Sequence, residues 1–143
     1  MFRPRVIPVL LLSGRTLVKS RQFQDFRYIG DPINAVRLFN EMKADELAFL
    51  DILATKENRP PSLELVKGIG EEASMPFAVG GGIRTIEDVR RVIGAGAEKV
   101  IINTAAVENP DFIKQASETF GASTIVVCLD VKRTPSGEER VWS

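Results

Sequence analysis

Several polar side chains stand directly after apolar segments of this chain, and these residues could do chemistry. Asp51 closes one such segment, Asn103 and Thr104 follow another, and Asp130 closes a third. In folds of parallel strands and helices, the carboxyl ends of the strands hold the active site. Asp130 could act there as a general acid or base, or it could cap a helix or pair with a following basic residue. Asn103 and Thr104 could donate to a phosphate, although such a pair alone is more often a turn.

A glycine-rich turn adds a second candidate feature. The stretch from Val79 through three glycines to Ile83 joins an apolar segment to a helix that Thr85 can cap. Backbone N–H groups in such a turn, beside the positive end of a helix dipole, can bind an anion. Gly81 and Gly82 are therefore candidate phosphate contacts. The same turn also fits ordinary loop geometry.

Charged residues mark the opposite ends of the expected strands. Arg5 and Lys99 share strand parity with the apolar residues that follow them, so both cations point inward at the strand starts. Glu46 stands just before another strand and could neutralise one of them. Buried charges need partners or a function. On these residues alone, a stabilising charged plug is the favoured interpretation.

The elements that must position these residues alternate along the chain. Apolar segments predict strands at residues 6–12, 47–52, 76–79, 99–103 and 125–130. Helix starts follow four of them, at Asp31-Pro32, Ser62, Thr85 and Asn109-Pro110. A short extended piece is expected at 16–19, and residues 21–28 are expected to form a mobile surface loop.

Alternation of this kind predicts an α/β fold with a parallel sheet covered by helices. A doubly wound sheet and a (βα)8 barrel both satisfy the pattern. The segment 44–51 weakly resembles the segment 97–103, about fifty residues later. A repeat of two strand–helix units suits a barrel better than an open sheet.

Composition argues against several classes of function. Basic and acidic residues both number 19, so no net charge attracts nucleic acid or anionic lipid. The longest apolar run, residues 6–12, is too short to cross a bilayer. The chain has no histidine and a single cysteine, Cys128, which removes serine triads, most zinc sites and an internal disulfide. We expect no metal and no cofactor, and the lone thiol fits a cytoplasmic protein.

Four stretches and one single residue match a known family in register over nearly the whole chain. They are residues 30–32, 45–52, 79–83 and 102–110, and Asp130. With these stretches the chain resembles the cyclase subunit of imidazole glycerol phosphate synthase, a (βα)8 barrel. That family joins ammonia from a glutaminase partner to a phosphorylated, nucleotide-like substrate in histidine biosynthesis. The Gly-Gly-Gly and Ile-Asn-Thr-Ala-Ala stretches are the most specific part of the match.

The resemblance implies roles for individual residues. Asp130 would be one of two catalytic carboxylates. The residues implied on the substrate and phosphate side are Gly81, Gly82, Asn103, Thr104, Lys19 and Asp51. Arg5, Glu46 and Lys99 match three of four charged residues that gate an ammonia passage, and Glu98 falls where the family meets its glutaminase. Under this resemblance, the expected role of Arg5 and Lys99 is to gate an ammonia passage, and no longer to form a stabilising charged plug.

One residue departs from the family's pattern. The family's other catalytic aspartate is replaced by Leu11, whose isobutyl group can neither take a proton nor stabilise a cation. The segments 8–12, 31–35 and 39–40 look more like paralogues from sugar-amidination pathways. We therefore expect altered chemistry on a phosphorylated or sugar-type substrate.

Length is the second departure. A barrel of this kind needs roughly 250 residues, whereas the chain has 143. We expect residues 1–143 to form a single incomplete barrel domain with about five of eight βα units, the N-terminal half plus strand five. Three alternatives stay open: a non-catalytic barrel that docks and activates a glutaminase, a fragment of a histidine-pathway cyclase, and a complete doubly wound phosphate-binding module.

Overall fold

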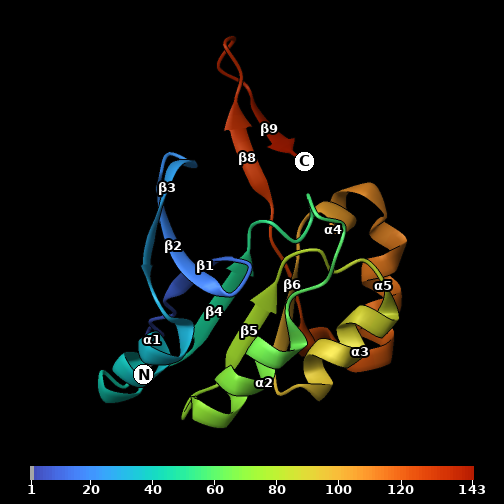
Figure 1. Cartoon of the computed structure of the whole chain (residues 1–143). Helices are drawn as coiled ribbons and strands as arrows, with labels where there is room; N and C mark the ends of the chain where they lie inside the picture. Colours follow the sequence, from blue (N-terminus) through green and yellow to red (C-terminus); the bar gives the residue numbers. More distant parts are fainter. Residues whose placement is uncertain (1) are drawn as a thin grey trace.

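The computed structural model describes residues 2–143 and has one main sheet (Figure 1). Its seven strands run in the order β3-β2-β1-β4-β5-β6-β7. Five neighbours in this order, β1, β4, β5, β6 and β7, are parallel, and β2 and β3 form an antiparallel hairpin at one edge. The strands are β1 (Val9–Ser13), β2 (Thr16–Arg21), β3 (Gln24–Gly30), β4 (Leu47–Asp51), β5 (Phe77–Gly80), β6 (Lys99–Ile102) and β7 (Ile125–Val127).

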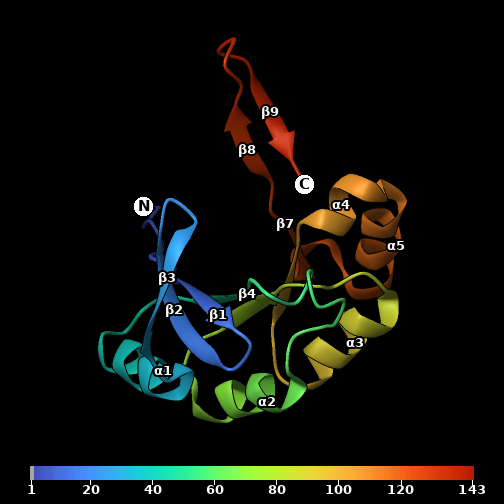
Figure 2. The ribbon, with the colours of Figure 1, turned by 45° about the horizontal axis from the view of Figure 1, so that its top comes forward.

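Four helices of nine to eleven residues connect the parallel strands: α1 (Pro32–Glu41), α2 (Leu63–Glu72), α3 (Ile86–Gly94) and α5 (Pro110–Phe120). They form an arc around the outer, convex face of the curved sheet (Figure 2). A short helix, α4 (Thr104–Glu108), and a 3-10 turn (Ala122–Thr124) complete the helical elements of the described residues. Helices on one face of a curved parallel sheet fit an arc of a barrel, since a doubly wound sheet is covered on both faces.

All four predicted helix starts are confirmed, three of them by side-chain caps, whereas Asn109 before α5 forms no side-chain cap hydrogen bond. Asp31 accepts hydrogen bonds from the N–H groups of Ile33 and Asn34 at the start of α1, and Ser62 accepts one from Leu65 at the start of α2. At α3, Thr85 and Asp88 form a reciprocal capping box. These contacts satisfy N–H groups that have no partner within the helix.

The main core lies between the convex face of the sheet and the helices. Leu47 and Phe49 of β4 are fully buried there, together with side chains such as Ile69 of α2 and Val89 of α3. The rings of Phe49 and Phe77 meet edge to face, with centroids 6.4 Å apart. The concave face instead carries small side chains, with Ala48 and Ala78 packed beside Ile101.

The segment expected to be a mobile loop is ordered as a hairpin, so that prediction is wrong. β3 pairs with β2 through Leu17–Gly30, Val18–Tyr28 and Lys19–Arg27. Gln22, Phe23 and Asp25 adopt positive φ angles at the tight turn. Alternating polar and aromatic residues suit a strand that is solvated on both sides, which single-residue polarity does not reveal.

The fifth parallel strand is shorter than predicted. β7 ends at Val127, and Asp130 begins β8 (Asp130–Arg133), which pairs with β9 (Glu139–Trp142) in a separate two-stranded sheet. A turn at residues 134–137 joins them. The prediction that Asp130 closes the fifth parallel strand is therefore wrong, because the chain leaves the sheet before that residue. Figure 1 shows this hairpin and the β2–β3 hairpin extending beyond the carboxyl ends of the parallel strands.

None of the helices between residues 2 and 143 has both the length and the apolar character that crossing a membrane requires.

The buried Phe49 side chain on β4 allows the packing of the core to be tested. We expect Phe49→Ala to lower the free energy of unfolding by about 3–5 kcal/mol, because it removes a fully buried ring and leaves a cavity. Urea unfolding followed by circular dichroism measures this change. The matched control is Phe2→Ala, since Phe2 is fully exposed and its loss should change stability by less than about 0.5 kcal/mol. Equal effects of the two variants would contradict the packing described here.

Candidate functional site

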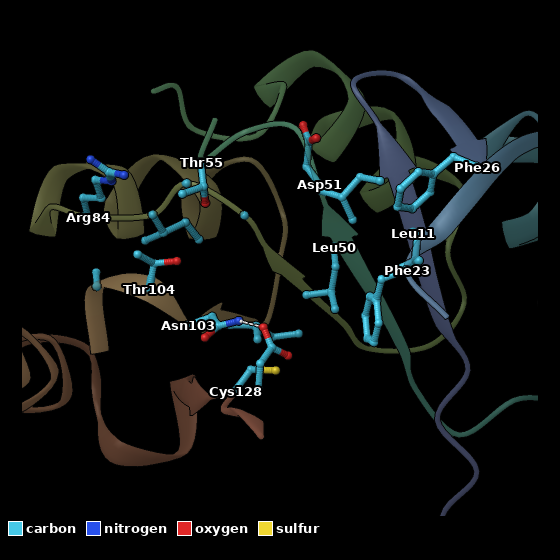
Figure 3. Close-up of a pocket in the computed structure, with 17 residues that line it drawn as sticks. Leu11, Phe23, Phe26, Leu50, Asp51, Thr55, Arg84, Asn103, Thr104 and Cys128 are labelled. Atoms are coloured by element: carbon cyan, nitrogen blue, oxygen red, sulfur yellow. Dashed lines mark hydrogen bonds between the residues drawn. The ribbon is translucent and has the colours of Figure 1, made fainter. Parts of the chain in front are cut away.

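A pocket of about 310 Å³ lies at the carboxyl ends of the parallel strands. Its walls come from β1, β4, β6, the glycine turn after β5 and the β2–β3 hairpin. Leu11, Phe23 and Phe26 lie on one side of it, and Asn103, Thr104 and Arg84 lie on the other (Figure 3). The pocket thus has an apolar, aromatic side and a polar side.

Asn103 and Asp130 meet in this pocket although they are far apart in sequence. The Asn103 Nδ2 group donates a hydrogen bond to Asp130 Oδ2 at 2.8 Å. The other amide atom, Asn103 Oδ1, is buried and has no hydrogen-bond partner among the described residues. A buried acceptor without a partner is costly. A ligand with a hydroxyl or amine hydrogen would satisfy it.

Cys128 also lines the pocket, beside Asp130. Partial burial, and then the negative charge of Asp130, raise the pKa of the Cys128 thiol. A raised pKa keeps the sulfur protonated at neutral pH, and the thiolate is the reactive form. Cys128 thus contributes a largely protonated thiol to the wall of the pocket.

The glycine turn is required by close backbone packing. A Cβ atom on Gly81 would lie 2.4 Å from the Asp51 carbonyl oxygen, and one on Gly82 would lie 2.0 Å from the Arg59 carbonyl oxygen. Both glycines also have φ angles in the left-handed region, at +116° and +65°. The turn is thereby pressed against the β4–α2 loop and borders the pocket. The turn is structurally tight and also borders the cavity, and phosphate contact by Gly81 and Gly82 stays a prediction.

Asp51 lines the pocket, but both of its carboxylate oxygens already have partners within the protein. Its side chain is 1% exposed and forms an ion pair with Arg59, with Nη1 2.7 Å from Oδ2. Its Oδ1 accepts from the N–H groups of Leu53 and, at 3.4 Å, Gly14. In register Asp51 pairs with Leu12, on the helix-facing side of the sheet. These contacts make Asp51 a residue that positions the neighbouring loops.

Arg59 is the residue that sequence reasoning missed. Hydrogen bonds to Asp51 and then to Glu57 raise the pKa of its guanidinium, so Arg59 stays charged. It also pairs with both carboxylates across the β4–α2 loop. The available signal was an arginine eight residues after a carboxylate that ends a strand.

Lys19 is not brought to the pocket. It is exposed on β2, opposite Arg27 of β3, and lines a separate shallow recess with Arg21 and Asp25. Leu11, by contrast, contributes to the wall of the main pocket.

The charged residues at the amino ends of the strands form one cluster. Glu46 accepts from Arg5 through Oε1 and lies 3.3 Å from Lys99 Nζ through Oε2. Its side chain is 11% exposed, against 22% for Lys99. Glu46 was expected to neutralise one cation, and it contacts both. Glu98, the neighbouring residue predicted at the partner interface, is exposed.

No group of three or more metal-ligating side chains is found among residues 2–143.

The fold and this pocket define the class of protein: an α/β domain of barrel type with a polar site at the carboxyl ends of its parallel strands. The model of the family described as "Histidine biosynthesis protein" matches residues 5–142. The chain belongs to this family of (βα)8 barrels.

Named relatives agree with this assignment. The chain is 47% identical over 133 residues to "Putative imidazole glycerol phosphate synthase subunit HisF" of Leptospira borgpetersenii, covering 93% of this chain and 52% of that protein. It is also 47% identical over 133 residues to "Imidazole glycerol phosphate synthase subunit HisF" of Methanococcus vannielii, covering 93% and 49%. The chain therefore spans about half the length of the relatives it matches.

The contact between the glycine turn and the β4–α2 loop gives a second test. We expect Gly82→Ala to lower the free energy of unfolding by more than about 2 kcal/mol, because the new Cβ meets the Arg59 carbonyl in a left-handed backbone conformation. Gly94→Ala is the matched control. A Cβ on Gly94 has nothing within 4 Å, so its change should stay within about 1 kcal/mol. Thermal unfolding of both variants measures the difference, and a stable Gly82→Ala protein would contradict the close approach.

Proposed function

We propose that this chain is part of a cyclase-like subunit of the imidazole glycerol phosphate synthase type. It uses ammonia from a glutaminase partner to form a C–N bond on a phosphorylated or sugar-type substrate. The loss of one family carboxylate at Leu11 alters its chemistry relative to the histidine-pathway enzyme. On this proposal, the protein belongs to the paralogous branch that is linked to sugar amidination.

The single observation that carries this proposal is the Asn103–Asp130 hydrogen bond at the pocket. It joins Asp130, the proposed acid or base, to Asn103, which together with Gly82 and Thr104 is proposed to hold a phosphate. Phosphate binding on one side would fix the reacting part of the substrate beside Asp130. Positioning of this kind contributes a large share of enzymatic rate enhancement.

Leu11 supports altered chemistry. It lines the same pocket as Asp130, together with Phe23 and Phe26. A pair of groups with different protonation states is the usual way to run acid and base steps at neutral pH. With Leu11 in place, Asp130 has no second carboxylate that is free to share the work, since Asp51 is tied to Arg59.

The Arg5–Glu46–Lys99 cluster supports ammonia entry from the opposite end. These side chains stand at the amino ends of the strands, while the pocket is at the carboxyl ends. Between them the concave face carries the small side chains of Ala48 and Ala78, packed beside Ile101. On this proposal ammonia would approach Asp130 from the amino ends of the strands.

The missing carboxylate can be put back. We expect Leu11→Asp to raise ammonium-dependent cyclisation of the histidine-pathway substrate by about 10²-fold or more, because it restores a proton-transferring group to the pocket. Leu11→Asn is the matched control, since it has nearly the same shape as Asp and cannot ionise. Initial rates of the full protein with ammonium chloride measure the effect. Near-normal turnover of the unaltered protein would contradict altered chemistry, and equal rates for both variants would contradict the role of the carboxylate.

A non-catalytic partner that activates a glutaminase is the second candidate. It is favoured by Glu98, which is exposed and next in sequence to Lys99 of the Arg5–Glu46–Lys99 cluster. This cluster lies at the opposite end of the strands from the pocket. The two functions can therefore be separated by mutation.

We expect Asp130→Asn to abolish product formation and to leave stimulation of the glutaminase unchanged, because the two sites lie at opposite ends of the strands. Glu98→Lys should abolish stimulation of the glutaminase and should leave product formation unchanged when ammonium is supplied directly. Glutamine hydrolysis and product formation are measured in parallel on the complex. An unaltered protein that stimulates the glutaminase but makes no product from either ammonia source would favour the non-catalytic partner.

A further inference from the structure

Arg84 is the only basic side chain among the described residues that line the pocket. The two carboxylates in that lining are Asp51 and Asp130. A phosphate dianion that enters beside them needs a positive counter-charge, and neutral donors such as Asn103 and Thr104 do not supply one. We propose that Arg84 binds the phosphate of the substrate, as a residue that selects for a charged ligand. This inference rests on the proposed function, because it concerns the same pocket.

The backbone places Arg84 firmly at the pocket rim. It follows Gly82 and the buried residue Ile83, and its own N–H donates to Asp88 Oδ2 at 3.1 Å. The same carboxylate accepts from Thr85 in the capping box of α3. The turn that carries the proposed phosphate contacts therefore also fixes the position of the Arg84 backbone.

The guanidinium is held by a neutral group. Arg84 Nη1 donates to Asn58 Oδ1 at 3.2 Å, from the β4–α2 loop. No carboxylate among residues 2–143 forms an ion pair with it, whereas nearby Arg59 is paired with Asp51 and Glu57. One of its five N–H donors is thus used for orientation, and its charge is not neutralised by the protein.

The surroundings of Arg84 suit an oxyanion. In Figure 3 it lies on the same side of the pocket as Thr55 and Thr104, away from Leu11 and the two phenylalanines. Hydroxyl donors beside a guanidinium favour a tetrahedral anion, since Arg can donate two parallel hydrogen bonds to phosphate oxygens. An ordinary solvated arginine on α3, such as Arg91, instead pairs with its neighbour Glu87.

Titration calorimetry of the full protein with inorganic phosphate tests this assignment. We expect Arg84→Gln to weaken phosphate binding by about tenfold to a hundredfold. Arg84→Lys should recover part of the loss, because it keeps the charge without the planar fork. Raising the salt concentration should weaken binding less in Arg84→Gln than in the unaltered protein. Arg91→Gln is the matched control and should bind phosphate normally.

The outcomes separate this inference from the proposed function. Normal phosphate binding by Arg84→Gln, together with weakened binding by Thr104→Val, would overturn the role of Arg84 and leave the phosphate site in place. Absence of phosphate binding in the folded, unaltered protein would overturn both. Unfolding curves for each variant show whether a loss of binding reflects a loss of structure.

Discussion

The close contact between the glycine turn and the β4–α2 loop is the constraint on which the rest of the site depends. Gly81 and Gly82 pack against backbone carbonyls of Asp51 and Arg59, at distances that no Cβ atom could share. The same two residues form an ion pair through their side chains. One buried carboxylate thus fixes the end of β4, the following loop and the turn beside the pocket. Removing Arg59 would leave the buried Asp51 carboxylate without its counter-charge.

The site is divided between elements that differ in burial. Its polar side stands on the glycine turn and on the ends of β6 and β7, which belong to the parallel sheet. Its apolar side depends on the β2–β3 hairpin, where Phe23 is 81% exposed and Phe26 is 48% exposed. Asp130 also stands on a hairpin, at the first residue of β8. Binding residues are therefore held by the core, whereas aromatic and catalytic candidates lie on protruding hairpins.

The proposed function separates phosphate recognition from proton transfer, and the two have different physical requirements. Phosphate recognition needs donors, space and positive charge, and residues around Gly82 and Arg84 are proposed to supply them. Proton transfer needs an ionisable group at one specified position, and at Leu11 that group is absent. A protein can keep the first while changing the second, since the two requirements fall on different strands.

The sequence by itself determined the elements whose signals are local. Asp31, Ser62 and Thr85 cap their helices as expected, because a cap involves residues two or three positions apart. Apolar runs located the parallel strands for the same reason, and the match of short stretches indicated the family. Only tertiary structure decided which polar residues meet. Glu46 joins Arg5 and Lys99, 41 and 53 residues away, and Asn103 joins Asp130 across 27. Such contacts depend on strand register and on where the chain leaves the sheet, and neither follows from local pattern. For that reason Asp51 is held by Arg59 and Lys19 is exposed outside the pocket.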